Sequence, residues 1–426
     1  MLSSNTVTKI VKIMSKEKSV SKPLTKVLPK KFMWTGTRAI AEAVKLADVD
    51  VIAAYPIRPY TGVMNSLAKM LADGDFAAEI IGADSEHSQF EIVKHASAVG
   101  ARTFVGSSGV GLAYAAEPII VTSLGQLPVV AMAGCRALDD PGNFGMEWND
   151  VLVFRDHGWL MSWAKDPQEA LDMILVAYRV SEDPSVLLPS FVVVDGAAIT
   201  HISAPVEPPS KDGVAKFLPP YKPSYPLDPN YGPVTKAQHI APSLIGPELR
   251  KVVDNSMAKA REVIQEAWKA YARIVGREYP PFIETKFIED AEIALVTMGA
   301  YSKDAMYVAE KLREQGIKVG VIRIRYFRPF PDKELAEALE KVDAVGVIDF
   351  SYSFGSADSS SVLFNEVRST LYDSGLRPLL MDFMFVGGRE PSVEHFEEAA
   401  RLLKRDAKRG AVEKHVMWPT LRGEDM

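Results

Sequence analysis

The chain of 426 residues is too long for one compact core, so its length predicts two domains. It carries 49 Lys and Arg against 55 Asp and Glu, and this net charge of −6 argues against binding to bulk nucleic acid. No apolar run reaches the ~18–20 residues of a membrane helix and no secretory segment opens the chain, so we expect a cytoplasmic protein. The single cysteine, Cys135, excludes an internal disulfide and any iron–sulfur cluster held by this chain alone.

Composition divides the chain into five regions. Residues 1–32 form a lysine-rich arm, which we expect either to be solvated or to contact a partner subunit. In 33–204, and again in 290–410, apolar strands alternate with helices, a pattern typical of parallel sheets covered on both faces. The region 205–289 opens with a proline-rich stretch, 205–247, that cannot join a central sheet, so we expect an extended crossover followed by a linker helix. Residues 411–426 form a polar tail.

The predicted elements of the first domain follow one another in regular alternation. A helix capped near Thr37 precedes the first strand, and Thr61 is predicted to cap the next helix. A helix over 85–99 is closed by Gly100, and a further helix opens at Asp166, which is followed by proline. The apolar runs that we expect to form strands are 51–55, 79–81, 103–105, 129–132 and 191–194.

The second half of the chain repeats this alternation after the crossover. Apolar residues recur at helical spacing from Met257 to Tyr271, which predicts a packing face of the linker helix. Four strand–helix units then predict a second, smaller α/β domain. Its strands are expected at 293–296, 319–324, 345–348 and 379–383, and its last helix is expected to begin at Ser392.

Four loops at the carboxyl ends of first-domain strands carry the residues that could bind a ligand, because open α/β sheets bind ligands at that edge. Arg58 is held extended between two prolines, and Ser108 and Gly109 form a turn that a ligand can approach closely. Glu86 lies in the first turn of a helix, where an acid also suits the helix dipole without any function. The loops are Tyr55–Thr61, Asp84–Ser88, Ser107–Leu112 and the long glycine-punctuated Gly134–Gly145.

Together these loops resemble the α subunit, or the corresponding domains, of thiamine-diphosphate-dependent 2-oxoacid:ferredoxin oxidoreductases. The resemblance covers about 33–400, and its motifs occur in the order of the family. It implies an α/β fold in which a pyrimidine-type thiamine-diphosphate-binding domain with a parallel sheet precedes a smaller domain like the C-terminal domain of transketolase. The matching segments are Tyr-Pro-Ile-x-Pro at 55–59, Ser-Glu-His-Ser at 85–88, Gly-Leu-Ala-Tyr at 111–114, Arg-Ala at 136–137, and 327–331, 353–355 and 385–389 in the second domain.

The resemblance implies a role for several residues in these loops. Glu86 matches the glutamate that hydrogen-bonds N1′ of the aminopyrimidine and favours the imino tautomer. Arg136 matches the arginine that binds the substrate carboxylate, a task suited to a planar bidentate donor. The remaining residues expected to contact the cofactor are Pro56, Ile57, Ser108 and Gly109.

The resemblance also implies partner subunits, because this chain lacks the Gly-Asp-Gly…Asn signature for Mg²⁺ and diphosphate and lacks cluster cysteines. A β subunit would supply the diphosphate and Mg²⁺ site and a cluster, and a γ/δ-type subunit would supply ferredoxin-like [4Fe–4S] clusters. Ferredoxin would accept the electrons, and the assembly is expected to be a dimer of hetero-oligomers. No metal is expected on this chain, which should be inactive alone.

Two departures from the pattern of pyruvate-using members point to oxalate as the substrate. Arg58 stands where those members usually have threonine, and the loop after Arg136 contains Asp139 and Phe144. Oxalate presents two carboxylates, whereas a second cation beside the methyl group of pyruvate would be costly. The chain therefore most resembles the oxalate oxidoreductase branch, in which oxalate is oxidised to two CO₂.

Asp139 and Phe144 lie five residues apart on a glycine-rich loop, which suggests that they exchange places near the cofactor and that the anion helps to expel product. Two alternatives remain open at this point. One is the α subunit of a pyruvate or other 2-oxoacid:ferredoxin oxidoreductase, and the other is a non-catalytic scaffold subunit that binds no cofactor.

Overall fold

The computed structural model describes residues 31–138, 143–236 and 242–423. The first part of the chain builds a seven-stranded sheet with the strand order β12-β6-β7-β5-β4-β2-β3. Six of these strands run parallel, five of them at the predicted apolar runs, and β12 pairs antiparallel with β6 at one edge. The strands are β2 (Val51–Ala54), β3 (Glu79–Gly82), β4 (Thr103–Ser107), β5 (Val130–Cys135), β6 (Leu160–Trp163), β7 (Ser190–Asp195) and β12 (Tyr326–Arg328).

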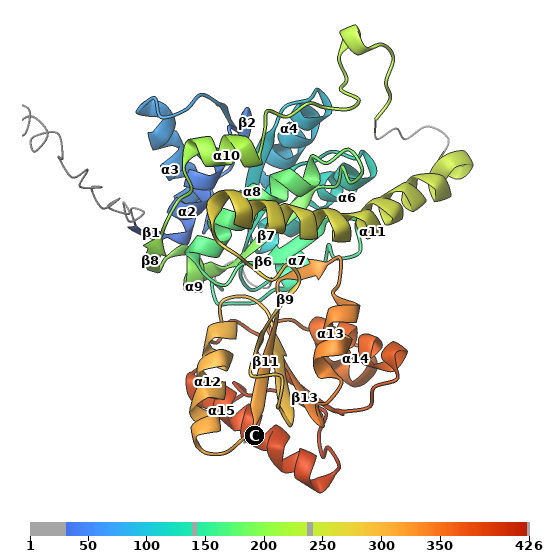
Figure 1. Cartoon of the computed structure of the whole chain (residues 1–426). Coiled ribbons are helices and arrows are strands. Elements are labelled where there is room, and N and C mark those ends of the chain that lie inside the picture. The colour runs from blue at the N-terminus through green and yellow to red at the C-terminus, as the bar shows by residue number, and fades with distance from the viewer. Residues whose placement is uncertain (1–30, 139–142, 237–241, 424–426) are drawn as a thin grey trace, which may run out of the picture.

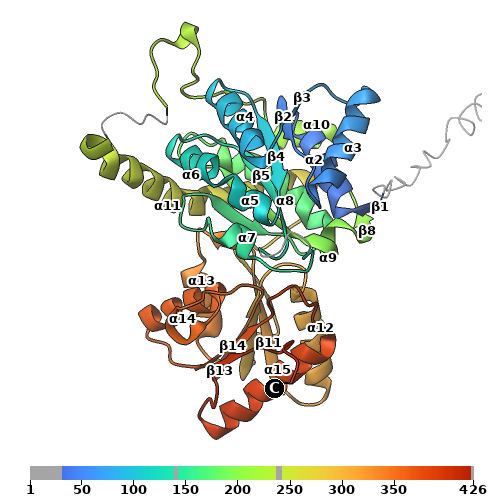
Figure 2. The same ribbon diagram turned by 180° about the vertical axis from the view of Figure 1, so that it is seen from behind.

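Helices cover both faces of this sheet (Figures 1 and 2). On one face, α2, α3 and α8 share a core with α10 and α11. On the other face, residues of α4, α5 and α6 belong to a second hydrophobic core, which continues into the second domain. Their bounds are α2 (Gly36–Leu46), α3 (Tyr60–Ala72), α4 (Glu86–Ala98), α5 (Val110–Tyr114), α6 (Ala116–Leu124) and α8 (Pro167–Ser181), with the short α7 (Asn149–Leu152) and α9 (Gly196–Thr200) between strands.

Local chemistry explains where these helices begin. Asp166 caps α8 as predicted, since its carboxylate accepts the N–H of Glu169 at 2.9 Å and proline follows it. Two predicted caps are wrong by one or two residues. Thr35, rather than Thr37, caps α2, because Thr35 is the last residue with extended backbone before the helix. Thr61 lies inside the first turn of α3, which starts one residue earlier.

The crossover between the domains stays outside the central sheet, as its prolines predicted. It contains β8 (Ser203–Val206), which pairs antiparallel with β1 (Phe32–Thr35), then α10 (Lys211–Phe217) and the 3₁₀ helix η1 (Pro229–Tyr231). The long helix α11 (Pro242–Val275) crosses the first domain, and its amino-terminal part projects beyond the sheet (Figure 1). Ala260, Ile264, Trp268 and Tyr271 are fully buried, so the helical stripe packs as predicted.

The second domain is a six-stranded sheet with the order β15-β14-β13-β10-β11-β9, in which only the edge strand β9 is antiparallel. Helices α12 and α15 lie on one face, and α13 and α14 on the other (Figure 1). The elements are β9 (Ile283–Lys286), β10 (Ile293–Thr297), α12 (Ser302–Glu314), β11 (Val319–Ile324), α13 (Asp332–Leu339), β13 (Ala344–Asp349), η2 (Ala357–Ser359), α14 (Val362–Ser374), β14 (Leu379–Met384), α15 (Val393–Arg409) and β15 (Val416–Met417).

Three features of this arrangement differ from the regions read off the sequence. Strand β12 leaves the second domain and extends the first sheet, where Tyr326 pairs with Ser162. Strand β6 is a sixth parallel strand of the first sheet, and no apolar run predicted it. The segment 411–426, predicted only as a polar tail, contributes β15 to the edge of the second sheet.

The carboxyl edge of the first sheet lies against the second domain. The Asp195 carboxylate, at the end of β7, accepts hydrogen bonds from the Ala300 N–H of the second domain and from Trp148 Nε1 at 2.9 Å. The Trp148 ring packs on Phe350 with 5.0 Å between ring centroids. The loops that follow the first-domain strands are therefore held between the two domains.

Candidate active site

Three of the four predicted loops meet at Ser108. Its hydroxyl donates a short hydrogen bond to the backbone carbonyl of Arg58, after β2, and accepts one from Arg136 Nε, after β5, at 3.2 Å. The strands β2, β4 and β5 are neighbours in the sheet, so their carboxyl ends bring these residues together. The hydroxyl of Ser108 thus fixes the spacing between the Arg58 backbone and the Arg136 side chain.

Glu86 is the first residue of α4 and is buried, with 8% of its surface exposed. The helix start is set by Ser85, whose hydroxyl accepts the N–H of Ser88 at 3.2 Å. One turn further along α4, the Gln89 side chain accepts the N–H of Tyr55 at 3.1 Å and donates to the Gly106 carbonyl at 3.0 Å. Gln89, which the sequence did not single out, therefore fixes α4 against the ends of β2 and β4.

The Glu86 carboxylate packs closely against Gly111. A Cβ atom on Gly111 would lie 2.5 Å from Glu86 Oε1 and 2.6 Å from Ile57 Cδ1, so a larger residue would force these groups to move. Ser107 Oγ would lie 2.8 Å from the same Cβ atom, and it is buried without a hydrogen-bond partner among the described residues. In the same ranges, no hydrogen bond or ion pair engages the Glu86 carboxylate.

Arg136 is almost buried, with 7% of its surface exposed. Its guanidinium lies 5.0 Å from the ring centroid of Phe144, a residue that is itself more than half exposed. Burial lowers the pKa of Arg136, while the Asp150 and Glu86 carboxylates oppose that shift. Arg136 and Glu86 therefore lie close enough to interact electrostatically.

The other predicted site residues differ in how exposed they are. The Arg58 side chain is exposed, and within the described ranges its guanidinium makes no ion pair or hydrogen bond. Pro56 is also exposed at the rim, while Ile57 reaches in towards Glu86. Gly109 adopts a positive φ of 54°, and a Cβ there would lie 2.8 Å from Arg136 Nε, so Gly109 makes room for that arginine.

Asp139 lies outside the described residues, so its predicted exchange with Phe144 stays a prediction.

Sequence reasoning missed one further residue of this site, Asp150, on the short helix α7. This buried carboxylate accepts the N–H of Gly109 at 2.8 Å and that of Arg136 at 3.1 Å. Nothing in the local sequence announces this function, because Asp150 comes 14 residues after Arg136 and 41 after Gly109.

Comparison with known proteins identifies the family. Residues 42–269 match the thiamine-diphosphate-binding region of pyruvate flavodoxin/ferredoxin oxidoreductases, and 291–396 match core domain II of pyruvate:ferredoxin oxidoreductase. The chain is 37% identical over 399 residues to pyruvate synthase subunit PorA of Pyrococcus horikoshii, covering 93% of this chain and 100% of the relative. The chain is an α subunit of the 2-oxoacid:ferredoxin oxidoreductase family.

Other members of the family act on different acids, as their names state. The α subunit is 33% identical over 395 residues to ketoisovalerate oxidoreductase subunit VorA of P. horikoshii, covering 92% of this chain and 99% of the relative. It also superposes on a solved 2-oxoglutarate:ferredoxin oxidoreductase from Magnetococcus marinus with a TM-score of 0.67 at 16% identity. That likeness covers 88% of this chain, which spans 65% of the longer one. The predicted fold and family are confirmed.

The residues around Glu86 fit the aminopyrimidine of the thiamine diphosphate that this family binds. An aminopyrimidine presents a ring nitrogen and an amino group on a flat apolar ring. The Glu86 carboxylate, which makes no hydrogen bond within the described residues, and the unpartnered Ser107 hydroxyl offer polar partners, and Ile57 beside them offers an apolar contact. This α subunit therefore carries the features expected for the pyrimidine end of the cofactor.

The described part of the α subunit also bears on metals and membranes. None of its groups of His, Cys, Asp and Glu side chains is arranged to hold a metal ion. None of the described helices combines the length and the apolar character that a membrane span requires.

Proposed function

We propose that this α subunit belongs to an oxalate oxidoreductase, which converts oxalate to two CO₂ and releases two electrons to ferredoxin. The observation that carries this proposal is that the Ser108 hydroxyl contacts both the backbone carbonyl of Arg58 and the Arg136 side chain, so the loops that carry these two arginines meet at one residue. Arg136 is buried beside Glu86, and Arg58 adds a second cation with no ion pair of its own among the described residues. Two cations at one site suit a substrate with two carboxylates.

Glu86 acts on the cofactor in this proposal. Thiamine diphosphate, when bound, supplies a nucleophilic carbon at thiazolium C2. The Glu86 carboxylate would accept a hydrogen bond from N1′–H of the imino tautomer of the aminopyrimidine, and would so favour the form whose exocyclic nitrogen can take a proton from that carbon. Burial of Glu86 next to Ile57 keeps water away from this hydrogen bond.

The two arginines bind and orient the substrate. Arg136 holds one carboxylate, and its low exposure strengthens the interaction because little water screens it. Arg58 meets the second carboxylate, which a monocarboxylate with a methyl group lacks. The proposal includes the exchange of Asp139 and Phe144 near the cofactor, with Phe144 lying over Arg136 in this structure.

The alternative substrate is a 2-oxoacid with one carboxylate, such as pyruvate. The names of the relatives support it, since they refer to pyruvate and ketoisovalerate. Arg58 would then be a solvated arginine at the rim. A non-catalytic scaffold is disfavoured, because a scaffold has no need for an unengaged buried carboxylate beside an unpartnered hydroxyl.

The partners belong to the same proposal. We infer that a β subunit completes the diphosphate and Mg²⁺ site and carries a cluster, and that a γ/δ-type subunit relays electrons through [4Fe–4S] clusters to ferredoxin. The whole would act in the cytoplasm as a dimer of hetero-oligomers, without nucleic acid or membrane.

Dye reduction by the purified, anaerobically prepared complex tests the proposal, with oxalate, pyruvate and ketoisovalerate compared at equal concentrations. We expect oxalate to give the highest kcat/KM. A preference for pyruvate or ketoisovalerate would establish the alternative. A complex without thiamine diphosphate by mass analysis, inactive on all three acids even with added cofactor, would indicate the scaffold.

A further inference from the structure

The Asp150 carboxylate joins two loops of the site through a single oxygen. Oδ2 accepts the backbone N–H of Gly109 at 2.8 Å and that of Arg136 at 3.1 Å. These residues follow β4 and β5, which pair with each other up to Ser107 and Ala133. Beyond that pair the strands separate, and their N–H groups can no longer bond across the ladder. Asp150 supplies the acceptor that buried N–H groups require.

The second domain holds the helix that carries Asp150. Asn149 donates to the Tyr352 carbonyl at 2.9 Å and accepts the Tyr352 N–H at 2.7 Å. The Trp148 N–H donates to the Phe350 carbonyl at 2.7 Å. Helix α7 has only four residues and would not hold a position by itself. Its place is therefore set by the loop that follows β13.

We propose that Asp150 is a positioning residue, which keeps Arg136 and the Ser108–Gly109 turn at a fixed spacing and ties that spacing to the second domain. The inference deepens the proposed function, because it concerns the arginine assigned there to the substrate carboxylate. Asp150 itself is wholly buried and binds the backbone N–H groups of Gly109 and Arg136, so in this proposal it acts through Arg136 and not on the substrate. Asp150 acts by setting the orientation of the Arg136 side chain.

Three variants separate positioning from general stability. D150A removes the acceptor, whereas D150N keeps one oxygen that can accept both N–H groups in a nearly identical shape. D382A is the matched control, because Asp382 is a buried carboxylate of the second domain that accepts two hydrogen bonds, both from Ser361. All three are prepared in the full complex and compared with wild type.

The kinetic readout is KM and kcat for whichever of oxalate and pyruvate the wild type oxidises. We expect D150A to lower kcat/KM about 10–100-fold, mostly through KM, because a misaimed Arg136 weakens substrate binding before and during reaction. D150N should keep KM within about threefold of wild type, and so should D382A despite its lower stability. An unchanged KM in D150A, or an equal rise in D150N, would overturn the inference.

A crystal structure of the D150A complex gives a second readout that does not depend on turnover. We expect the Arg136 Nε to Ser108 Oγ contact of 3.2 Å to be lost in D150A and kept in D150N. If Arg136 is undisturbed in D150A, the positioning role of Asp150 is refuted, whatever the activity of the wild type. If the wild type oxidises neither acid, the proposed function is refuted, and the crystal structure still tests the positioning role. If D150A does not assemble, D150E replaces it, since the added methylene displaces the oxygens and the same criteria apply.

Discussion

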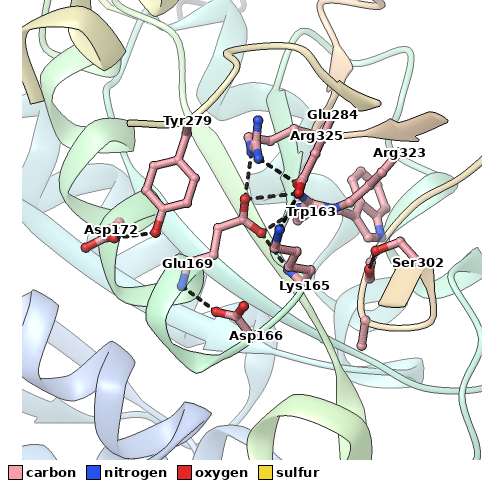
Figure 3. A network of polar contacts seen from close by, with 12 residues as sticks. Trp163, Lys165, Asp166, Glu169, Asp172, Tyr279, Glu284, Ser302, Arg323 and Arg325 are labelled. Carbon is pink, nitrogen blue, oxygen red and sulfur yellow. Dashed lines mark hydrogen bonds and ion pairs between the residues drawn. The ribbon is translucent and has the colours of Figure 1, made fainter. Parts of the chain in front are cut away.

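Glu169 of the first domain and Arg323 of the second form an ion pair of 2.6 Å between side chains that are almost wholly buried (Figure 3). Arg325 contacts the other oxygen of Glu169 at 2.7 Å, and Glu284 contacts both arginines. Burial alone would raise the pKa of Glu169, but the two guanidinium groups hold it at about 2. This cluster fixes the second domain against α8, and hence against the sheet that carries the site.

Replacing Glu169 by alanine should destabilise the protein strongly. The change leaves the buried Arg323 and Arg325 with only part of their compensating charge, and breaking such a pair typically costs about 3–5 kcal/mol. Denaturant unfolding of the purified complex measures the loss. Lys69→Ala, which breaks an exposed pair with Asp73, should cost less than about 1 kcal/mol. A similar small cost for Glu169→Ala would show that the cluster does not hold the domains together.

Glu86→Gln should fold and assemble but lose most activity. An amide cannot favour the imino tautomer as a carboxylate does, and such acid–base contributions are about 10²–10⁴-fold. Initial rates of dye reduction at saturating cofactor measure the loss. Glu117→Gln, an exposed acid on the same face that pairs with His87, is the control and should stay near the wild-type rate. Activity of Glu86→Gln within a few-fold of wild type would remove Glu86 from the mechanism.

Gly111→Ala should weaken cofactor binding without unfolding the chain. The added Cβ would meet Glu86 Oε1 and Ile57 Cδ1 closer than side chains tolerate, so both must move away from the position at which we propose that they contact the aminopyrimidine. Titration of the cofactor-free complex with thiamine diphosphate should show at least a tenfold higher Kd. Gly246→Ala serves as the control, since its nearest neighbour would be Arg250 Nη1 at 3.9 Å. Equal affinities in the two variants would contradict the assignment of these contacts to the cofactor.

Arg58→Thr tests the oxalate proposal most directly. Removing the second cation leaves one carboxylate of oxalate only partly compensated, which typically costs about 2–5 kcal/mol, or roughly 30–4,000-fold in kcat/KM. Weak pyruvate oxidation should also rise, because the cation no longer disfavours a methyl group. Arg58→Lys keeps the charge but not the planar donor, so its kcat/KM for oxalate should lie between those of wild type and Arg58→Thr. An unchanged oxalate rate in Arg58→Thr would mean that Arg58 is a solvated rim residue.

Asp382→Asn should change how stability depends on pH. Burial, together with the nearby Asp349 carboxylate, raises the pKa of Asp382 to about 8, against an ordinary value of 3.8. Because the folded-state pKa is the higher one, its contribution to stability is complete below pH ~4 and is lost as the pH rises towards 8. The asparagine does not titrate and can keep both hydrogen bonds to Ser361.

The Tm of Asp382→Asn relative to wild type should therefore increase from pH 5 to 8 and then level off. Thermal unfolding of both complexes at each pH gives this difference. Asp73→Asn, at an exposed position, should show a constant difference across the same range. A constant difference for Asp382→Asn as well would mean that Asp382 is ionised throughout.

The sequence by itself determined the two α/β domains, the parallel sheets and the four loops that carry Arg58, Glu86, Ser108 and Arg136. These features depend on local patterns. Continuous apolar runs form buried parallel strands, and ligand loops follow their carboxyl ends. Asp166 capped its helix as predicted because a cap needs only its immediate neighbours.

The tertiary structure alone decided the contacts between residues far apart in the chain. Strand β12 joins the first sheet rather than the second because Tyr326 pairs with Ser162, a partner that no local pattern identifies. Asp150 binds Gly109 and Arg136 because folding brings α7 beneath the separating ends of β4 and β5. Short-range propensities follow from each residue and its neighbours, whereas the partner of a buried polar group depends on how the whole chain packs.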